Sequence, residues 1–178
     1  MPCATGLNLC DSLGSFTNSS GAWGLFKCVP ARSKLSNMNA LTLKQAQTIV
    51  NTAIAEARQR QFKPMGVIVV DASGNPVAFA REYGASMLRF NIARGKAFGA
   101  VGMGVSSRVL FERAKENPNF FVSLASAGEG KFLPQTGAVL IKDAHGQILG
   151  AAGASGGTGD EDELICMAGV KAAGLECG

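Results

Sequence analysis

Four cationic side chains lie close together in the sequence, around the end of one predicted strand and the helix that follows it. They are Arg81, Arg89, Arg94 and Lys96. Guanidinium and ammonium groups bind carboxylates through charge-assisted hydrogen bonds, so the cluster is typical of a site for an anionic ligand. The alternative is a charged surface that contacts only water, and the sequence leaves both interpretations open.

A second stretch with chemical potential is the glycine-rich loop of residues 153–157, which matches the nucleophile pattern G-x-S-x-G between a predicted strand and a helix. A nucleophilic serine of this kind takes its base from a later histidine, but the single histidine, His145, precedes the loop in a predicted turn. We therefore interpret Ser155 and Gly156 as part of a tight turn whose polar groups bond backbone or ligand.

The acidic run Asp160–Glu163 follows these glycines. Asp160 is predicted to cap the last helix, with Glu163 as its capping-box partner, and negative charge suits the start of a helix. The run would repel a phosphate from the loop, unless Arg94 or Lys96 lies across from it. It lacks the spacing of a calcium loop, so we predict no metal site.

Composition limits the class of protein. The 178 residues are 47% hydrophobic and 17% charged, with a net charge of +4, which indicates one globular domain. Basic residues are spread along the chain, and no apolar run reaches the length of a membrane span, so neither nucleic acid nor membrane is expected as a partner. Five cysteines without metal-type spacing indicate free thiols and a cytoplasmic location.

Periodicity supplies the elements that must position these residues. Residues 1–38 show no period and are predicted to be a disordered or loosely docked extension of a domain at 39–178. Thr42 is predicted to cap a first helix, residues 65–71 and 77–82 form a hairpin, and Ser86 caps a helix over 87–103 that is rich in Gly and Ala. A neighbouring element of the fold, a second subunit or a flat ligand could approach this helix closely.

The second half of the domain is predicted to continue with a helix over 108–117 that Pro118 ends and a loop over 119–131 with room for one short strand. A second hairpin over 138–152 and the last helix follow. Hairpins require antiparallel pairing, and helices on both sides of them can cover both faces of one sheet. The sequence therefore predicts a mixed α/β fold, with an antiparallel sheet between helices.

Four stretches in this order resemble the small haem-binding family of GlcG and HbpS, which also forms the C-terminal domain of some corrinoid adenosyltransferases. They are LTLKQAQTIVNTAIAEA, GVIVVDASGNPVAFARE, the A-x-x-K-A-x-x-A run from Ala93, and ILGAAGASGGTGDEDE. The resemblance implies a profilin-like three-layer α/β/α sandwich that assembles into homo-oligomers, from dimers to octamers. It also implies haem as a cofactor, with His145 as a candidate axial ligand.

The function expected from this resemblance is binding or degradation of haem, or binding of another planar anionic ligand. Such a ligand would lie over the small-residue helix, with its acid groups bound by Arg81, Arg94 or Lys96, and with Arg89, Ser155 and Gly156 nearby. The alternative is a lyase or isomerase of a catabolic pathway that acts on a small organic or aromatic acid. In that case Arg94 and Lys96 would bind the carboxylate, and Glu82, Tyr83 or Asp162 would move protons, with Lys96 as a further catalytic candidate.

Overall fold

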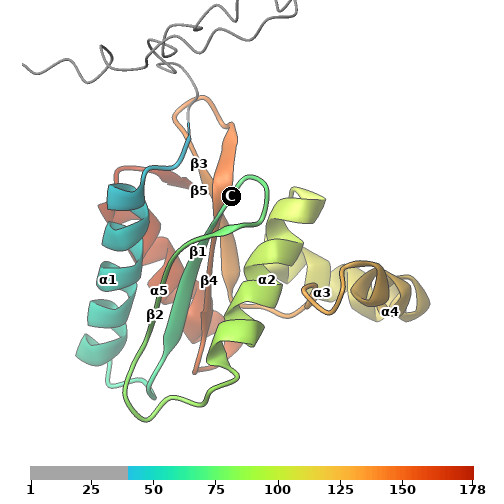
Figure 1. Ribbon diagram of the computed structural model, residues 1–178, viewed down its shortest axis with the longest axis horizontal. Helices are drawn as coiled ribbons and strands as arrows, with labels where there is room; N and C mark the ends of the chain where they lie inside the picture. The colour runs from blue at the N-terminus through green and yellow to red at the C-terminus, as the bar shows by residue number, and fades with distance from the viewer. Residues whose placement is uncertain (1–39) are drawn as a thin grey trace, which may run out of the picture. The chain divides into compact units, whose positions relative to one another are not determined.

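The structure is a computed structural model that describes residues 40–178 (Figure 1). In this range the helices are α1 (Leu43–Gln59), α2 (Arg89–Met103), α3 (Ser107–Glu116), α4 (Pro118–Ala127) and α5 (Gly159–Ala172). The strands are β1 (Gly66–Asp71), β2 (Pro76–Arg81), β3 (Ala138–Lys142), β4 (Ile148–Ser155) and β5 (Glu176–Cys177). The predicted extension lies outside the described residues, so the division into 1–38 and 39–178 stays a prediction.

The strands form one antiparallel sheet in the order β2-β1-β4-β3-β5. β1 is apolar on both faces and has a strand on each side, as its sequence predicts. Gly66 of β1 lies opposite both Arg81 and Ser155, so β2 and β4 finish at the same end of the sheet. We call this the Ser155 end. The turns at 71–75 and 143–147 lie at the opposite end.

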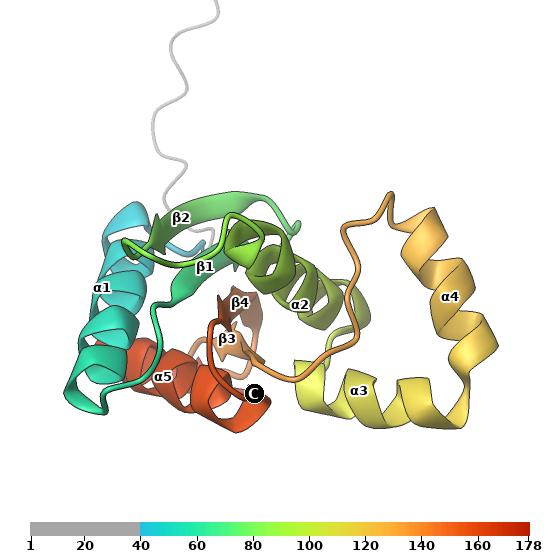
Figure 2. The same cartoon turned by 90° about the horizontal axis from the view of Figure 1, so that it is seen from below.

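Helices cover both faces of the sheet, which confirms the predicted three-layer arrangement (Figures 1 and 2). α1 and α5 pack on one face, where they meet Val67 and Val69 of β1. α2 packs on the other face, where Ile68 and Val70 of the same strand join its cluster. Each of these four side chains is fully buried, which stabilises the fold by about 1.5–3 kcal/mol per side chain.

The small residues of α2 contact other elements of the same fold. A Cβ at Gly153 of β4 would lie 2.5 Å from the carbonyl oxygen of Ala93, so α2 rests directly on the backbone of the sheet. On another side of the helix, the Leu133 N–H donates to the Gly95 carbonyl at 3.1 Å, and a Cβ at Gly95 would lie 2.8 Å from the Leu133 Cβ. The close approach that the glycines and alanines allow is therefore used by β4 and by residues 131–133.

The prediction of a loop over 119–131 is wrong for the first part of this segment, because residues 118–127 form α4. Pro118 was expected to end the preceding helix, and it also begins this one, since proline suits the first helical position. The sequence of α4 shows little helical periodicity of apolar residues. The reason is that Phe121 is the one residue of this helix that is buried, so the other positions need not be apolar. β5 was also not predicted, and its two residues pair with the end of β3.

The helix starts were predicted with mixed success. Thr42 caps α1 in a capping box with Gln45, as expected. Ser86 does not cap α2, which begins at Arg89 after an N-cap residue that makes no side-chain cap bond. The cap of α5 is Thr158, whose hydroxyl accepts from the Glu161 N–H at 3.2 Å.

The expectation that Asp160 and Glu163 form the capping box of α5 is therefore wrong. Both carboxylates instead pair with Arg108 of α3, and the Glu163 carboxylate also accepts from the Gly137 N–H at 3.4 Å. The two acids thus tie α5 to α3 and to the start of β3.

Candidate functional site

Several residues singled out in the sequence meet at the Ser155 end of the sheet. Arg81 is the last residue of β2 and Ser155 is the last residue of β4. Arg89, at the start of α2, reaches across β1 and donates from Nη1 to the Ser155 Oγ at 3.3 Å. Ser155 is buried, so its hydroxyl serves as a partner for a cation from α2.

Lys96 and Asp162 form a buried ion pair beside this end. The Lys96 Nζ lies 2.8 Å from the Asp162 Oδ2, and the two side chains are 7% and 2% exposed. Nζ also donates to the Ala154 carbonyl at 3.1 Å, and the Asp162 Oδ1 accepts from the Gly157 N–H at 3.1 Å. A Cβ at Gly137 would lie 2.6 Å from Nζ, so the main chain of the loop before β3 closes over the pair.

Burial raises the pKa of the Asp162 carboxyl, and the nearby Lys96 ammonium and Gly157 N–H oppose that rise. Lys96 does lie across from the glycine-rich loop, but its charge faces Asp162 and a carbonyl oxygen. The pair joins α2, β4, the loop and α5. The catalytic and ligand-binding roles expected for Lys96 and Asp162 stay predictions, while in the structure both groups bond to internal partners.

Glu82 is also bonded within the domain. Its carboxylate accepts from the Met65 N–H at 2.7 Å and lies 2.6 Å from the Arg58 Nε. These contacts fix the start of the β2–α2 connection against β1 and the end of α1. Gly156 is buried against Pro64 and Met65, where a side chain would not fit.

The connection between β2 and α2 exposes an apolar surface. Phe79, Tyr83, Met87 and Leu88 are 37%, 103%, 78% and 50% exposed. The Phe79 ring packs edge-on against Phe90 at a centroid distance of 4.9 Å. With the cations Arg81 and Arg94 these residues define what we call the β2–α2 surface: Phe79, Arg81, Tyr83, Met87, Leu88, Phe90 and Arg94.

The two arginines belong to this surface by the periodicity of their elements. Arg81 follows Phe79 by two residues in a strand and so lies on the same face of the sheet. Arg94 follows Phe90 by four residues in a helix and so lies on the same side of α2. The Nε of Arg94 is buried and has no hydrogen-bond partner among the described residues, and the same holds for the Nε of Arg89. An unsatisfied buried N–H of this kind costs about 1–3 kcal/mol, which an anionic acceptor could offset.

His145 lies far from this surface. It is exposed in the turn between β3 and β4, where its N–H donates to the Asp143 Oδ1 at 2.9 Å. β4 separates this turn from Ser155, and eight residues of strand span roughly 25 Å. The structure therefore does not bring the imidazole together with the predicted cations.

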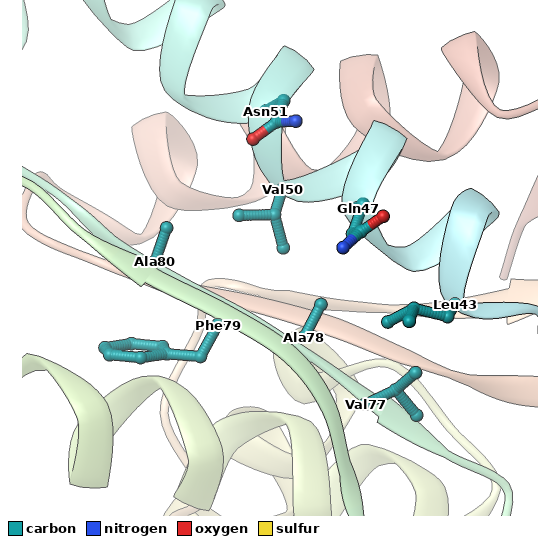
Figure 3. Close-up of a pocket in the computed structure, with 8 residues that line it drawn as sticks. All are labelled: Leu43, Gln47, Val50, Asn51, Val77, Ala78, Phe79 and Ala80. Carbon is teal, nitrogen blue, oxygen red and sulfur yellow. The ribbon is translucent and has the colours of Figure 1, made fainter.

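A groove of about 280 Å³ lies on the other side of β2, between this edge strand and α1 (Figure 3). Its walls are mostly apolar, with the amides of Gln47 and Asn51 on α1, while the Phe79 ring lies on the opposite side of the strand from Ala80 (Figure 3). This groove was not predicted from the sequence, although two amides four residues apart on a helix share one face. Among the described residues no cation lines the groove, so it does not suit a dicarboxylate ligand.

Within residues 40–178, no group of three or more His, Cys, Asp or Glu side chains is placed to hold a metal ion. In the same range, no helix combines the length and the apolar character needed to cross a membrane.

Known proteins share both the sequence pattern and the fold. A family model described as haem degrading protein HbpS-like matches residues 41–171. The corrinoid adenosyltransferase PduO of Salmonella typhimurium is 28% identical over 149 residues, which are 83% of this chain and 43% of PduO. The chain therefore spans less than half the length of that relative.

Two solved structures are similar over most of their length. A complex of PduOC with haem has a TM-score of 0.69 at 26% identity and covers 77% of this chain and 97% of that one. A structure of HbpS has a TM-score of 0.66 at 28% identity and covers 80% and 97%. Since the family match extends over most of the chain, this protein belongs to the HbpS-like family of haem-degrading proteins.

Proposed function

We propose that the protein binds haem on the β2–α2 surface, with the haem propionates bound by Arg81 and Arg94. Haem as the ligand is supported by membership of the HbpS-like family and by the similar PduOC structure, which is a complex with haem. The position is supported by this chain's own residues. The observation that carries it is that an exposed apolar surface adjoins Arg94, whose buried Nε has no partner among the described residues.

The chemistry of the surface fits the ligand. A porphyrin ring is planar and apolar, so it would pack on Phe79, Met87 and Leu88, whose side chains are already exposed to water. Its two carboxylates require cations at the edge of that apolar area, and guanidinium groups bind carboxylates through bidentate hydrogen bonds. When bound, haem would supply redox-active iron, while the chain's residues would orient the ring and bind its acid groups.

This position differs from the sequence-based expectation of a ligand over the small residues of α2. Those residues pack on β4 and on residues 131–133, whereas Phe90 and Arg94 lie on a side of the same helix that meets β2. Lys96 has no part in the proposed site, because its Nζ is bonded to Asp162 and Ala154. The expected homo-oligomer stays a prediction, and a second subunit could cover the outer face of the ring.

Titration of the purified protein with hemin tests the proposal. We expect a saturable Soret shift, and at least tenfold weaker binding for Arg81→Gln/Arg94→Gln, since one hydrogen bond to a charged group contributes about 1.5–3 kcal/mol. Arg113→Gln, an exposed cation of α3, is the matched control and should bind as the wild type does. An absent shift, or equal affinities for the double variant and the control, would contradict the proposal.

A further inference from the structure

We infer that Tyr83 is the axial ligand of the haem iron in this protein. The inference rests on the proposed function and adds a ligand to the same surface. Protein side chains that bind haem iron are imidazole, thiolate, thioether and phenolate groups. The question is which of these groups the fold places beside the apolar residues and cations that would bind the ring.

Position separates the histidine and the two cysteines of residues 40–178 from this surface. His145 lies at the opposite end of the sheet, across the length of β4. Cys166 of α5 is fully buried in the core cluster that α5 shares with α1, and Cys177 lies on β5, at the far edge of the sheet from β2. The β2–α2 surface holds two ligand-type side chains, Tyr83 and Met87.

Tyr83 is the better presented of the two. It is 103% exposed, and it stands at the tip of a turn that is fixed on both sides. Before it, the Glu82 N–H donates to the Met65 carbonyl at 3.0 Å and the Glu82 carboxylate accepts from the Met65 N–H. After it, the Ala85 N–H donates to the Glu82 carbonyl at 3.1 Å, and the Arg81 Nη1 donates to the Ala85 carbonyl at 3.3 Å.

Gly84 completes this turn with a φ of +82°, in the left-handed region that glycine adopts readily. A rigid backbone below a free side chain limits the entropy lost when a ligand bond forms. Met87 has a longer, flexible side chain with a neutral sulfur, and it lies in the less regular stretch before α2. An anionic oxygen suits ferric iron better than a thioether does.

The binding step is an exchange of ligands without a change in oxidation state. Tyr83 would release its phenolic proton to solvent and donate an Oη lone pair to the ferric iron of hemin, and a water ligand of the iron would leave. The chain has one tyrosine, so any phenolate signature of the complex reports this residue. The side chain lies in water, so Tyr83→Phe removes the hydroxyl without disturbing the core.

Spectroscopy of the full chain loaded with hemin tests the inference. We expect resonance Raman bands of an iron-bound phenolate in the wild type, their loss in Tyr83→Phe, and at least tenfold weaker binding by that variant. His145→Ala is the matched control and should keep both the bands and the affinity, and Met87→Leu should keep the phenolate bands.

The outcomes separate the two proposals. A wild-type protein without a saturable Soret shift would overturn haem binding, and the ligand assignment with it. A wild type that binds hemin without phenolate bands, or a Tyr83→Phe protein with the wild-type spectrum, would overturn the assignment of Tyr83 alone. Loss of the wild-type spectrum in His145→Ala would assign the iron to the histidine instead.

Discussion

Replacement of Lys96 by Met is expected to destabilise the protein strongly. The change keeps a long side chain that can pack in the same space. It leaves the Asp162 carboxylate buried at 2% exposure, with the Gly157 N–H as its remaining hydrogen-bond partner among the described residues. Loss of one member of a buried ion pair costs about 3–5 kcal/mol, because the other charge stays desolvated. For a domain of this size that corresponds to a fall in Tm on the order of 10 °C.

Urea unfolding followed by circular dichroism measures this loss as a change in midpoint at constant slope. Lys44→Met, on the exposed side of α1, is the matched control, and it should change the free energy of unfolding by no more than about 0.5 kcal/mol. The double variant Lys96→Met/Asp162→Leu removes both charges, so it should recover most of the stability that the single change loses. A loss below about 1 kcal/mol for Lys96→Met, or a double variant less stable than the single one, would refute this account.

The loss should also depend on pH. Burial raises the pKa of Asp162, and Lys96→Met removes the cation that opposes this rise. A carboxyl whose pKa is higher in the folded state favours folding at low pH, and that contribution disappears as the pH rises through the folded-state pKa. The deficit relative to the wild type should therefore be largest near neutral pH and shrink as the pH falls, because the carboxyl of the variant takes up its proton at a higher pH than that of the wild type.

Two further predictions concern packing and thiol chemistry. Gly102→Ala should stabilise the protein by about 0.5–1 kcal/mol, since a Cβ there meets no atom within 4 Å, whereas Gly153→Ala should destabilise it because its Cβ would lie 2.5 Å from the Ala93 oxygen. Urea unfolding of the two variants measures both effects, and equal stabilities would contradict the contact of α2 with β4. The Cys166 thiol should resist iodoacetamide at neutral pH until the protein unfolds, because burial raises its pKa well above the usual range. Peptide mass mapping checks this, and rapid labelling of the folded protein would contradict it.

The sequence carried enough local information to predict most of the fold. The apolar run of β1 and the turn residues after it specify a hairpin, and Thr42 with Gln45 specifies a helix start. The start of α5 was predicted wrongly because Thr158 with Glu161 and Asp160 with Glu163 have the same capping spacing. Local spacing does not separate the two. The structure uses the earlier pair, while Asp160 meets Arg108 of α3, a partner distant in sequence.

The site was harder to predict for the same reason. Arg81, Arg89 and Ser155 were singled out from local patterns, and the sheet register brings them to one end. The partner of Lys96 was not predictable, because Asp162 is 66 residues away and meets it only after α2 has docked on β4. The exposure of Met87 and Leu88 was also missed, although these two apolar residues precede α2 at a start without a side-chain cap.

The two sides of α2 explain why a planar ligand is placed outside the core. A Cβ added at Gly153 would lie only 2.5 Å from the Ala93 carbonyl oxygen, so a porphyrin ring has no room between α2 and the sheet. Arg94 follows Phe90 by one helical turn, so it lies on the side of α2 where Phe90 contacts Phe79 of β2. The Lys96–Asp162 pair and the contact at Gly153 both fix α2 on the sheet. Lys96 therefore acts on a ligand of the β2–α2 surface by positioning the helix that carries Phe90 and Arg94, and its replacement should change haem affinity only as far as it moves or unfolds α2.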